Sequence, residues 1–295
     1  MAVAKFMETN GDLPINQYRK EHGNAFVEEL HETVKPATIK RYLAQVRPIF
    51  STAINDLEID MKNPLSMITI PETDDDDFEP KKLPFSLEEL WAIQQRCMEV
   101  DDEFRWMIAA LSNTGARLSE VAGLHRDEVF LGGDVPYIHI NFSSLRRIKN
   151  TNSMRTVPLV GVSLWAVKRA YEASSDSEYL FPKVVRDGSY DPKTTSNSLN
   201  KWVTNQKLRG PKQSIHSLRH SMRDRLRNSY CPPDIAYRIG GWKMGGVGEE
   251  YGLGHHLSVL HEAMLRTLRT EAASGKEMPA LIPRVAEQAS DKNQS

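Results

Sequence analysis

The sequence predicts a mainly α-helical protein of the α+β class: a small helical domain, then a larger, mostly helical domain with a small antiparallel β-sheet. Three observations support this prediction. Apolar residues recur at three- and four-residue spacing over most of the chain, which is typical of helices that bury one face. Strand-like patterns are confined to two neighbouring segments, 137–142 and 155–159. One acidic segment, residues 72–83, separates the two domains.

Residues 1–71 are expected to form the small helical domain. An amphipathic segment near 17–33 predicts one helix. A second helix is indicated by eight apolar residues that share one helical face: Ile39, Tyr42, Leu43, Val46, Ile49, Phe50, Ala53 and Ile54. Thr38 is its expected N-cap, and Pro48 is expected to kink it or to divide it into two shorter helices.

The two domains are joined by an acidic segment that lies between Pro71 and Pro84 and reads PETDDDDFEPKKLP with its flanking prolines. It contains four consecutive aspartates and almost no apolar residues, so it cannot pack as a helix or a strand. We expect residues 72–83 to be a linker whose acidic side chains face solvent or hold basic residues. The larger domain then spans 84–272, and 273–295 form a polar tail with an apolar patch near Leu281.

The larger domain opens with a capping box, in which Ser86 and Glu89 satisfy the first backbone N–H groups of a helix. Gly115 is expected to end the next helix. The two strand-like segments predict a hairpin with a basic tip. Helices are expected near residues 86–98, 104–113, 117–123, 163–173, 196–206, 217–228 and 234–239.

The net charge of −1 conceals a strongly basic segment. Residues 140–228 contain 17 Lys and Arg but only six Asp and Glu. Such a segment is typical either of a solvated face or of a phosphate-binding surface. Within it, Arg219, Arg223 and Arg227 share one helical face. They would follow a phosphate backbone or pair with acids such as Asp224.

Composition also bounds the compartment. No segment approaches the ~20 apolar residues that a membrane span needs, and the first residues lack the basic flank and apolar run of a signal peptide. Cys97 and Cys231 lie in unrelated contexts, which predicts neither a disulfide framework nor a zinc site. These observations favour a cytoplasmic protein without a membrane partner.

Four short elements follow one another in the larger domain. They are TGARLSEVAGL with Arg117, the hairpin tip with Lys149, HSLRH with His216 and Arg219, and GGWKMGGVGEEYG with Trp242 and Tyr251. In the order and spacing of these elements the chain resembles the tyrosine recombinases, the family of lambda-type phage integrases and Xer recombinases, over about 38–270. The His-x-x-Arg element and the tyrosine nine residues after Trp242 are the most specific parts of this resemblance.

The same residues form a coherent set for phosphodiester transfer, which needs a nucleophile, positive charge on the non-bridging oxygens and a proton for the departing oxygen. Tyr251 is the expected nucleophile. Arg117 and Arg219 would clamp the phosphate without a metal or another cofactor, because a guanidinium stays charged and binds two oxygens at once. His216 would carry the tyrosine proton or bind a phosphate oxygen.

The resemblance places Lys149 at the leaving 5′ oxygen and Trp242 at the wall of the site, where its indole N–H would face a phosphate oxygen. Six residues separate Lys149 from Arg155, one more than in many relatives. Neighbouring arginines of the hairpin could therefore replace Lys149. The residues expected to contact DNA are Arg146, Arg147, Arg155 and Arg223.

Each residue also has a simpler structural interpretation. His216 and His220 have a metal-ligand spacing, but they lack a third ligand or an adjacent glutamate, which argues against a metal site. Tyr251 taken alone would more often be a half-buried aromatic residue, and Glu120 is expected to brace its helix rather than to react. The joint pattern supports the chemistry, whereas no single residue does.

The resemblance implies site-specific DNA recombination, as in the integration or excision of mobile DNA, through a 3′-phosphotyrosyl intermediate. Residues 1–71 would be a core-type DNA-binding domain and 84–272 the catalytic domain, together forming a C-shaped clamp on DNA at the nucleoid. The implied partners are double-stranded attachment sites, further copies in a tetramer on two sites, and DNA-bending accessory proteins. The tail, 273–295, would pack on a neighbouring copy.

Two other functions share part of this pattern. A type IB topoisomerase or a hairpin telomere resolvase would use the same tyrosine chemistry without exchanging DNA partners. A non-enzymatic DNA-binding regulator would keep the basic surface and lose part of the site. Many phage integrases also carry an additional N-terminal domain, whereas here barely 15 residues precede the first expected helix. We expect that domain to be absent or not included in this sequence.

Overall fold

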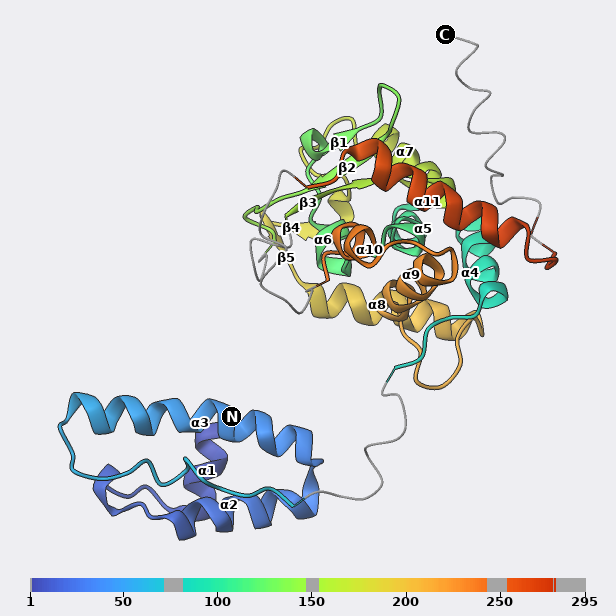
Figure 1. Cartoon of the computed structure of the whole chain (residues 1–295). Coiled ribbons are helices and arrows are strands. Elements are labelled where there is room, and N and C mark those ends of the chain that lie inside the picture. The colour runs from blue at the N-terminus through green and yellow to red at the C-terminus, as the bar shows by residue number, and fades with distance from the viewer. Residues whose placement is uncertain (1, 72–81, 147–153, 243–253, 278, 280–295) are drawn as a thin grey trace. The chain divides into compact units, whose positions relative to one another are not determined.

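The chain is organised as two compact units, Met1–Glu79 and Pro80–Ser295, in a computed structural model. The structure describes residues 2–71, 82–146, 154–242, 254–277 and 279. The division between the units falls inside the acidic segment. The fold class is confirmed, because helices dominate both units and the sheets are small and antiparallel (Figure 1). No helix of the described ranges is long and apolar enough to cross a membrane.

The first unit is a small helical bundle. Its elements are α1 (Ala2–Asn10), η1 (Ile15–Gln17), α2 (Lys20–Thr33) and α3 (Pro36–Asp56). Aromatic rings meet edge to face in its core: Phe6 of α1 packs on Phe26 and Phe50, with ring centroids 5.2 and 5.7 Å apart. Helix α1 was not predicted from the sequence, although its Phe6 ring contacts the rings of both Phe26 and Phe50.

Helix α3 differs from its prediction at two points. It begins at Pro36 with Lys35 at the N-cap, so the expectation that Thr38 caps it is wrong. Proline suits the first helical position because it has no N–H to leave unpaired there. Pro48 also does not divide the helix, which is continuous through it, whereas the expected kink stays a prediction. Pro48 and Ala44 are exposed, so the carbonyl that loses its N–H partner faces water.

Among the described residues, the second unit contains the remaining helices and the strands. Its helices are α4 (Leu87–Val100), α5 (Glu103–Thr114), α6 (Leu118–Ala122), α7 (Gly161–Ala173), α8 (Pro192–Asn205), α9 (Ser217–Asn228), α10 (Pro233–Gly240) and α11 (Leu257–Ala272). The strands and short 3₁₀ turns are η2 (Arg126–Glu128), β1 (Val129–Phe130), β2 (Tyr137–Ile140), β3 (Arg155–Pro158), η4 (Pro182–Val184), β4 (Val185–Arg186) and β5 (Ser189–Tyr190). The predicted helices are all present, with ends shifted by a few residues.

Helix α5 is the centre of this unit. Its sequence, EFRWMIAALSNT, is apolar on nearly every side, and every residue from Trp106 to Thr114 is buried. Helices α4, α6, α7 and α9 pack around it. Asp102 caps its first turn by accepting a hydrogen bond from the Arg105 backbone N–H at 3.1 Å. The predicted capping box of Ser86 and Glu89 at the start of α4 is confirmed.

The larger sheet has the order β1-β2-β3 with antiparallel pairing, which confirms the predicted hairpin. Ile138 pairs with Val157 and Ile140 with Arg155. These four residues point toward the helical core and are all buried. Because one of the four is an arginine, the core must supply a charged partner for it.

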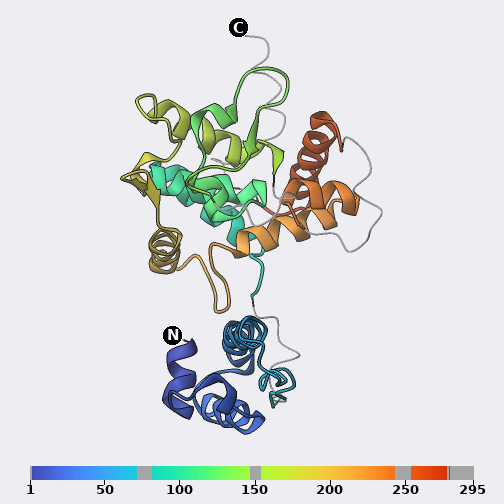
Figure 2. The same cartoon turned by 90° about the vertical axis from the view of Figure 1, so that its left-hand side faces the viewer.

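Helix α11 packs on β3, α9 and α10, as Figures 1 and 2 show. This helix is not among those predicted from the sequence. Its buried residues follow one face at three- and four-residue spacing: Leu260, Ala263, Met264, Thr267 and Glu271. The helix therefore closes the core on the side where β3, α9 and α10 meet.

Truncating Ile108 tests whether α5 is the centre of the second unit. Ile108 is fully buried, so Ile108→Ala should lower the free energy of unfolding by about 2–5 kcal/mol, through lost burial and the cavity left behind. Tryptophan fluorescence in urea reports on this unit alone, because all five tryptophans lie between residues 91 and 242. Val259→Ala, at a position 40% exposed, is the control and should change stability by less than about 0.5 kcal/mol. Equal effects of the two substitutions would contradict this assignment.

Candidate active site

The turn that follows α5 carries the first candidate residue, Arg117. Gly115 ends α5 with φ +64°, a conformation that favours glycine. A Cβ at this position would also lie 3.2 Å from Met222 and 3.4 Å from Trp242. The turn places Arg117 at the N-cap of α6, and its side chain is 37% exposed. Arg117 is therefore accessible to a ligand while its backbone is held in place.

Glu120 holds two arginines with one carboxylate. Its Oε1 accepts from Arg117 Nη1 at 2.6 Å and its Oε2 from Arg155 Nη2 at 2.9 Å, while the Arg117 backbone N–H donates to Oε2 at 2.7 Å. Burial opposes ionisation of this carboxyl, but Arg155 and Arg117 outweigh it and hold its pKa below the ordinary value. The sequence predicts that Glu120 braces its own helix; in the structure its carboxylate fixes two guanidiniums, Arg117 and Arg155.

The prediction that Arg155 and Arg146 contact DNA is corrected by the structure, because both side chains are buried in ion pairs. The Arg155 side chain is fully buried, and its Nε donates to the Ile239 carbonyl at 2.9 Å in addition to the Glu120 bond. The Arg146 side chain is 1% exposed and pairs with Glu128. Buried guanidiniums with carboxylate partners have no surface to offer a phosphate. The strand alternation could have revealed Arg155, because it shares a face with buried Val157.

Arg219 lies in the first turn of α9, where the ends of two other helices hold it. Its guanidinium donates to the carbonyl of Gly115 at 2.5 Å, to that of Gly240, and to that of Gly241 at 3.3 Å. These carbonyls belong to the C-terminal ends of α5 and α10, where the helix dipole favours a cation. Burial and the neighbouring Arg117 and Arg155 lower the pKa of Arg219 to about 9, so it remains charged at neutral pH.

Trp242 forms the floor under Arg219. The guanidinium lies 4.8 Å from the centre of the indole ring, which is a cation–π contact. Gly240 gives the ring its space, since a Cβ there would come within 2.4 Å of three ring carbons. Arg223 also lies over this ring, at 5.7 Å, and donates to the Tyr237 hydroxyl at 3.0 Å. Arg223 is partly buried and its contact with DNA stays a prediction.

His216 precedes α9 and faces the same region. Its ring meets that of His220 edge to face, with centroids 5.1 Å apart. Burial lowers the pKa of His216, and the charges of His220, Arg219 and Arg117 lower it further. The imidazole is therefore neutral at neutral pH, which leaves it one N–H donor and one acceptor nitrogen.

Arg117 and His216 line one cavity of about 290 Å³, together with residues of α8. Arg219 lies beside it through its bond to the Gly115 carbonyl. The fold thus brings Arg117 together with His216 and Arg219, which lie about 100 positions later in the sequence. A small anion such as a phosphodiester has donors here from two sides of the cavity.

Three predicted residues lie outside the described residues: Lys149 and Arg147 of the hairpin, and Tyr251. Their roles stay predictions. The adjoining described residues are Arg146 and Met154 for the hairpin, and Trp242 and Gly254 for the tyrosine. Among the described residues there is no group of three or more His, Cys, Asp or Glu that could hold a metal ion.

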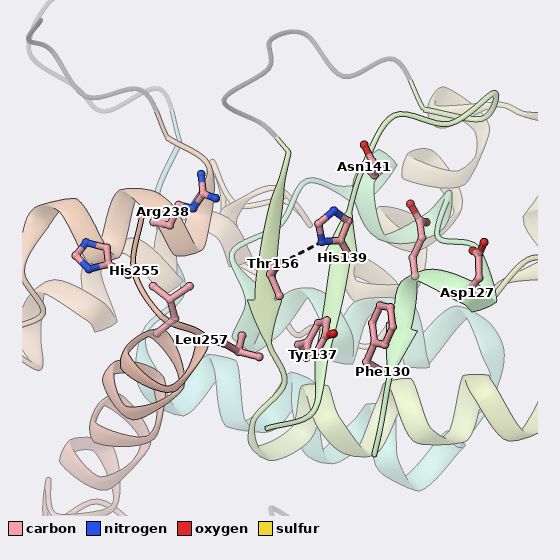
Figure 3. A pocket seen from close by; sticks show the side chains of 11 residues that line it. Asp127, Phe130, Tyr137, His139, Asn141, Thr156, Arg238, His255 and Leu257 are labelled. Carbon is pink, nitrogen blue, oxygen red and sulfur yellow. Dashed lines mark hydrogen bonds between the residues drawn. The ribbon is translucent and has the colours of Figure 1, made fainter. Parts of the chain in front are cut away.

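A larger cavity of about 660 Å³ lies on the outer face of the β1-β2-β3 sheet (Figure 3). Tyr137 and His139 of β2 and Thr156 of β3 point into it, and His139 Nδ1 lies 3.1 Å from Thr156 Oγ1. The first residues of α11 border it on the other side. None of the described candidate residues lines this cavity, so the smaller cavity is the better candidate for the active site despite its size.

The sequence of the chain matches a known protein family. The family model "Phage integrase family" matches residues 85–251, which is more than half of the chain. The chain belongs to the phage integrase family. The match begins next to the capping box of α4 and ends at Tyr251, so it includes every residue that the sequence analysis places in the catalytic set. The predicted resemblance to the tyrosine recombinases is thereby confirmed. No curated protein matches the chain significantly.

Solved structures similar to this member of the family show the same fold. The Tn1549 transposon integrase in complex with transposon right-end DNA is 20% identical, covers 91% of each chain and has a TM-score of 0.63. The XerH recombinase bound to a palindromic difH substrate is 15% identical over 92% of this chain and 75% of that one, with a TM-score of 0.63. A lambda integrase tetramer bound to a Holliday junction is 14% identical over 84% and 71%, with a TM-score of 0.61.

Glu120→Gln should destabilise the second unit, because it removes the carboxylate that pairs with the buried Arg155. We expect a loss of roughly 3–5 kcal/mol in the free energy of unfolding, measured in urea by tryptophan fluorescence. Glu172→Gln is the matched control: Glu172 also follows its arginine partner by three residues, but its side chain is 66% exposed. That change should cost less than about 1 kcal/mol. Similar losses in the two variants would contradict the bracing role.

The lowered pKa of Glu120 also predicts how stability depends on pH. A carboxyl whose folded pKa lies below its ordinary value of 4.5 stabilises the fold above that pH, and this contribution is lost as the pH falls through the folded pKa. The difference in unfolding free energy between the wild type and Glu120→Gln should therefore be constant above about pH 6 and shrink only below the ordinary pKa. Urea titrations across this range measure it. A difference that stays the same at acidic pH would rule out ionised Glu120 as the source.

Proposed function

We propose that this protein is a site-specific DNA recombinase that cleaves and rejoins DNA strands through a covalent bond to Tyr251. The observation that carries the proposal is the cavity lined by Arg117 and His216, with Arg219 beside it, in a member of the phage integrase family whose family match ends at Tyr251. Nucleophile, cations and proton carrier are then all present on one chain.

In the proposed cleavage step, the Tyr251 hydroxyl oxygen attacks the phosphorus of the scissile phosphodiester and gives up its proton. The bond from phosphorus to the 5′ oxygen breaks, and that oxygen leaves with a proton. The product is a 3′-phosphotyrosyl link and a free 5′ hydroxyl. A 5′ hydroxyl of the partner strand then attacks this link and releases the tyrosine. One phosphoester replaces another, so no energy source is consumed.

The described residues can support this step in complementary ways. Arg117 is half-exposed on a braced turn, so it can bind a non-bridging oxygen without moving its backbone. Arg219 supplies a fixed charge in a partly desolvated place, where electrostatic stabilisation is stronger than in water. Neutral His216 can donate to a phosphate oxygen or accept the tyrosine proton.

Two further residues complete the proposal. Lys149 would donate the proton to the departing 5′ oxygen, since an ammonium is a compact proton donor on a long side chain. Trp242, which supports Arg219 from below, would offer its indole N–H to the phosphate. Arg147 and Arg223 would contact the DNA backbone nearby.

The proposed partners are double-stranded attachment sites and three further copies of the chain. A lambda integrase tetramer on a Holliday junction has a similar fold, which supports a tetramer on two sites here. Accessory DNA-bending proteins and a nucleoid location belong to the same proposal. Because the contacts are mainly to phosphates, DNA binding should weaken steeply as the salt concentration rises.

Tyr251→Phe tests the nucleophile directly. The wild-type protein, incubated in EDTA with a nicked attachment-site substrate, should form a covalent protein–DNA band on a denaturing gel, and the variant should form none. DNA binding by gel shift should be the same for both, because only one hydroxyl is lost. Tyr230→Phe, at a side chain 90% exposed, is the matched control and should retain the band. Binding without any covalent band in the wild type would favour a non-enzymatic DNA-binding regulator, and relaxation of supercoils without strand exchange would favour a topoisomerase.

A further inference from the structure

Helix α9 carries a second arginine with many partners, the partly buried Arg225, six residues after Arg219. Its Nε and Nη2 donate to the two carboxylate oxygens of Glu271, at 2.5 and 3.0 Å. The two side chains are only 9% and 10% exposed. Glu271 lies in the last turn of α11, so this bidentate pair joins α9 to the end of the C-terminal helix.

The same guanidinium also reaches the end of α5. Arg225 Nη1 donates to the Ser112 carbonyl at 2.7 Å, and Nη2 donates to Asn113 Oδ1 at 2.9 Å. The Ser112 carbonyl is one of the last of the helix and has no intrahelical N–H to receive. The fork-shaped Arg225 side chain thus donates hydrogen bonds to a carboxylate, to a backbone carbonyl at the end of a helix and to a side-chain amide oxygen.

Asn113 extends this contact into a buried polar network. Gln94 of α4 donates to Asn113 Oδ1 at 3.2 Å and to Ser112 Oγ at 2.8 Å. Asn113 in turn donates to the Val160 carbonyl, before α7, at 3.3 Å. Four helices therefore meet at the last turn of α5 through hydrogen bonds whose directions are fixed.

This last turn of α5 leads directly into the active site. Gly115, two residues after Asn113, provides the carbonyl that receives Arg219, and Arg117 follows two residues later. Helix α9 thus donates to the end of α5 twice, once through Arg219 at the cavity and once through Arg225 on the side of α11. Helix α11 itself begins six residues after Tyr251 in the chain.

We propose that Arg225 and Glu271 are positioning residues for DNA cleavage. Their ion pair ties the helix that follows the nucleophile to the turn that carries Arg117 and receives Arg219. It would thereby set the distance between the nucleophile and the two phosphate-binding arginines. This inference rests on the proposed function and adds two residues that touch no substrate.

The physical reason is that phosphoryl transfer depends steeply on alignment. Misplacement of reacting groups by about 1 Å can cost on the order of a hundredfold in rate. A shift of α9 along α5 would move Arg219 relative to Arg117, because the two arginines are held by different helices. Binding of DNA would change little, since neither Arg225 nor Glu271 has the exposure to reach it.

The test uses the full chain and two variants, Glu271→Gln and Arg225→Lys. The first removes the charge and keeps the shape, whereas the second keeps an ion pair and loses the fork that reaches Ser112 and Asn113. The single-turnover rate of covalent complex formation at saturating DNA should fall about tenfold or more in both. The dissociation constant for DNA should stay within about twofold.

Thr267→Val is the matched control. Thr267 Oγ1 lies 2.8 Å from Ser229 Oγ, so this isosteric change removes a buried contact between the same two helices, α9 and α11, without touching α5. Its cleavage rate per folded molecule should equal that of the wild type. Thermal melts give the folded fraction for each protein, and Arg225→Lys carries the test if Glu271→Gln does not fold.

Wild-type cleavage rates in folded Arg225→Lys would overturn the positioning role and leave the proposed function intact. An equal loss of rate in Thr267→Val would also overturn it, because any loosening of α11 would then suffice. A wild-type protein that binds the substrate and never forms the covalent band would overturn the proposed function and the positioning role together.

Discussion

The carboxylate of Glu120 is the constraint on which the rest of the site depends. It holds Arg117 at the mouth of the cavity and Arg155 in the core, so one buried negative charge fixes two positive ones. Arg155 then donates to the Ile239 carbonyl near the end of α10. Gly241, with φ +61°, follows, and a Cβ there would lie 2.6 Å from the Arg155 guanidinium. The strand, the short helix and the end of α10 are therefore positioned by one connected set of charges.

The site also holds more positive charge than its own carboxylate can neutralise. Arg117, Arg155 and Arg219 lie around Glu120, and Arg223 lies over the same indole ring as Arg219. Burial lowers the pKa of Arg219 and of His216, and the neighbouring positive charges lower both further. A phosphodiester would relieve this excess of positive charge, since it adds negative charge beside Arg117 and His216, which line the cavity. Positive charges that are held close together repel one another, and an anion bound between them would lower this repulsion. Such an arrangement is typical of preorganised electrostatic sites.

Buried arginines explain where the sequence prediction succeeded and where it was wrong. The helices, the hairpin and the capping box follow from spacing and local chemistry, and all are present. Arg146 and Arg155 were assigned to DNA because charge in a sequence indicates a surface by default. Their carboxylate partners, Glu128 and Glu120, lie 18 and 35 positions earlier in the chain, beyond the reach of any local pattern. Helix α11 was not predicted for a different reason. Thr267 and Glu271 interrupt its apolar face, and their hydrogen-bond partners are also distant in the sequence.

The sequence by itself determined the fold class, the family and the order of the described helices other than α1 and α11, because these depend on periodicity and on motifs whose residues are close together. It also predicts Arg117, His216, Arg219 and Tyr251 as one chemical set. Only the tertiary structure decided which arginines face the cavity and which brace it. That choice depends on which carboxylates and helix ends are within hydrogen-bonding distance, and packing alone brings those groups together.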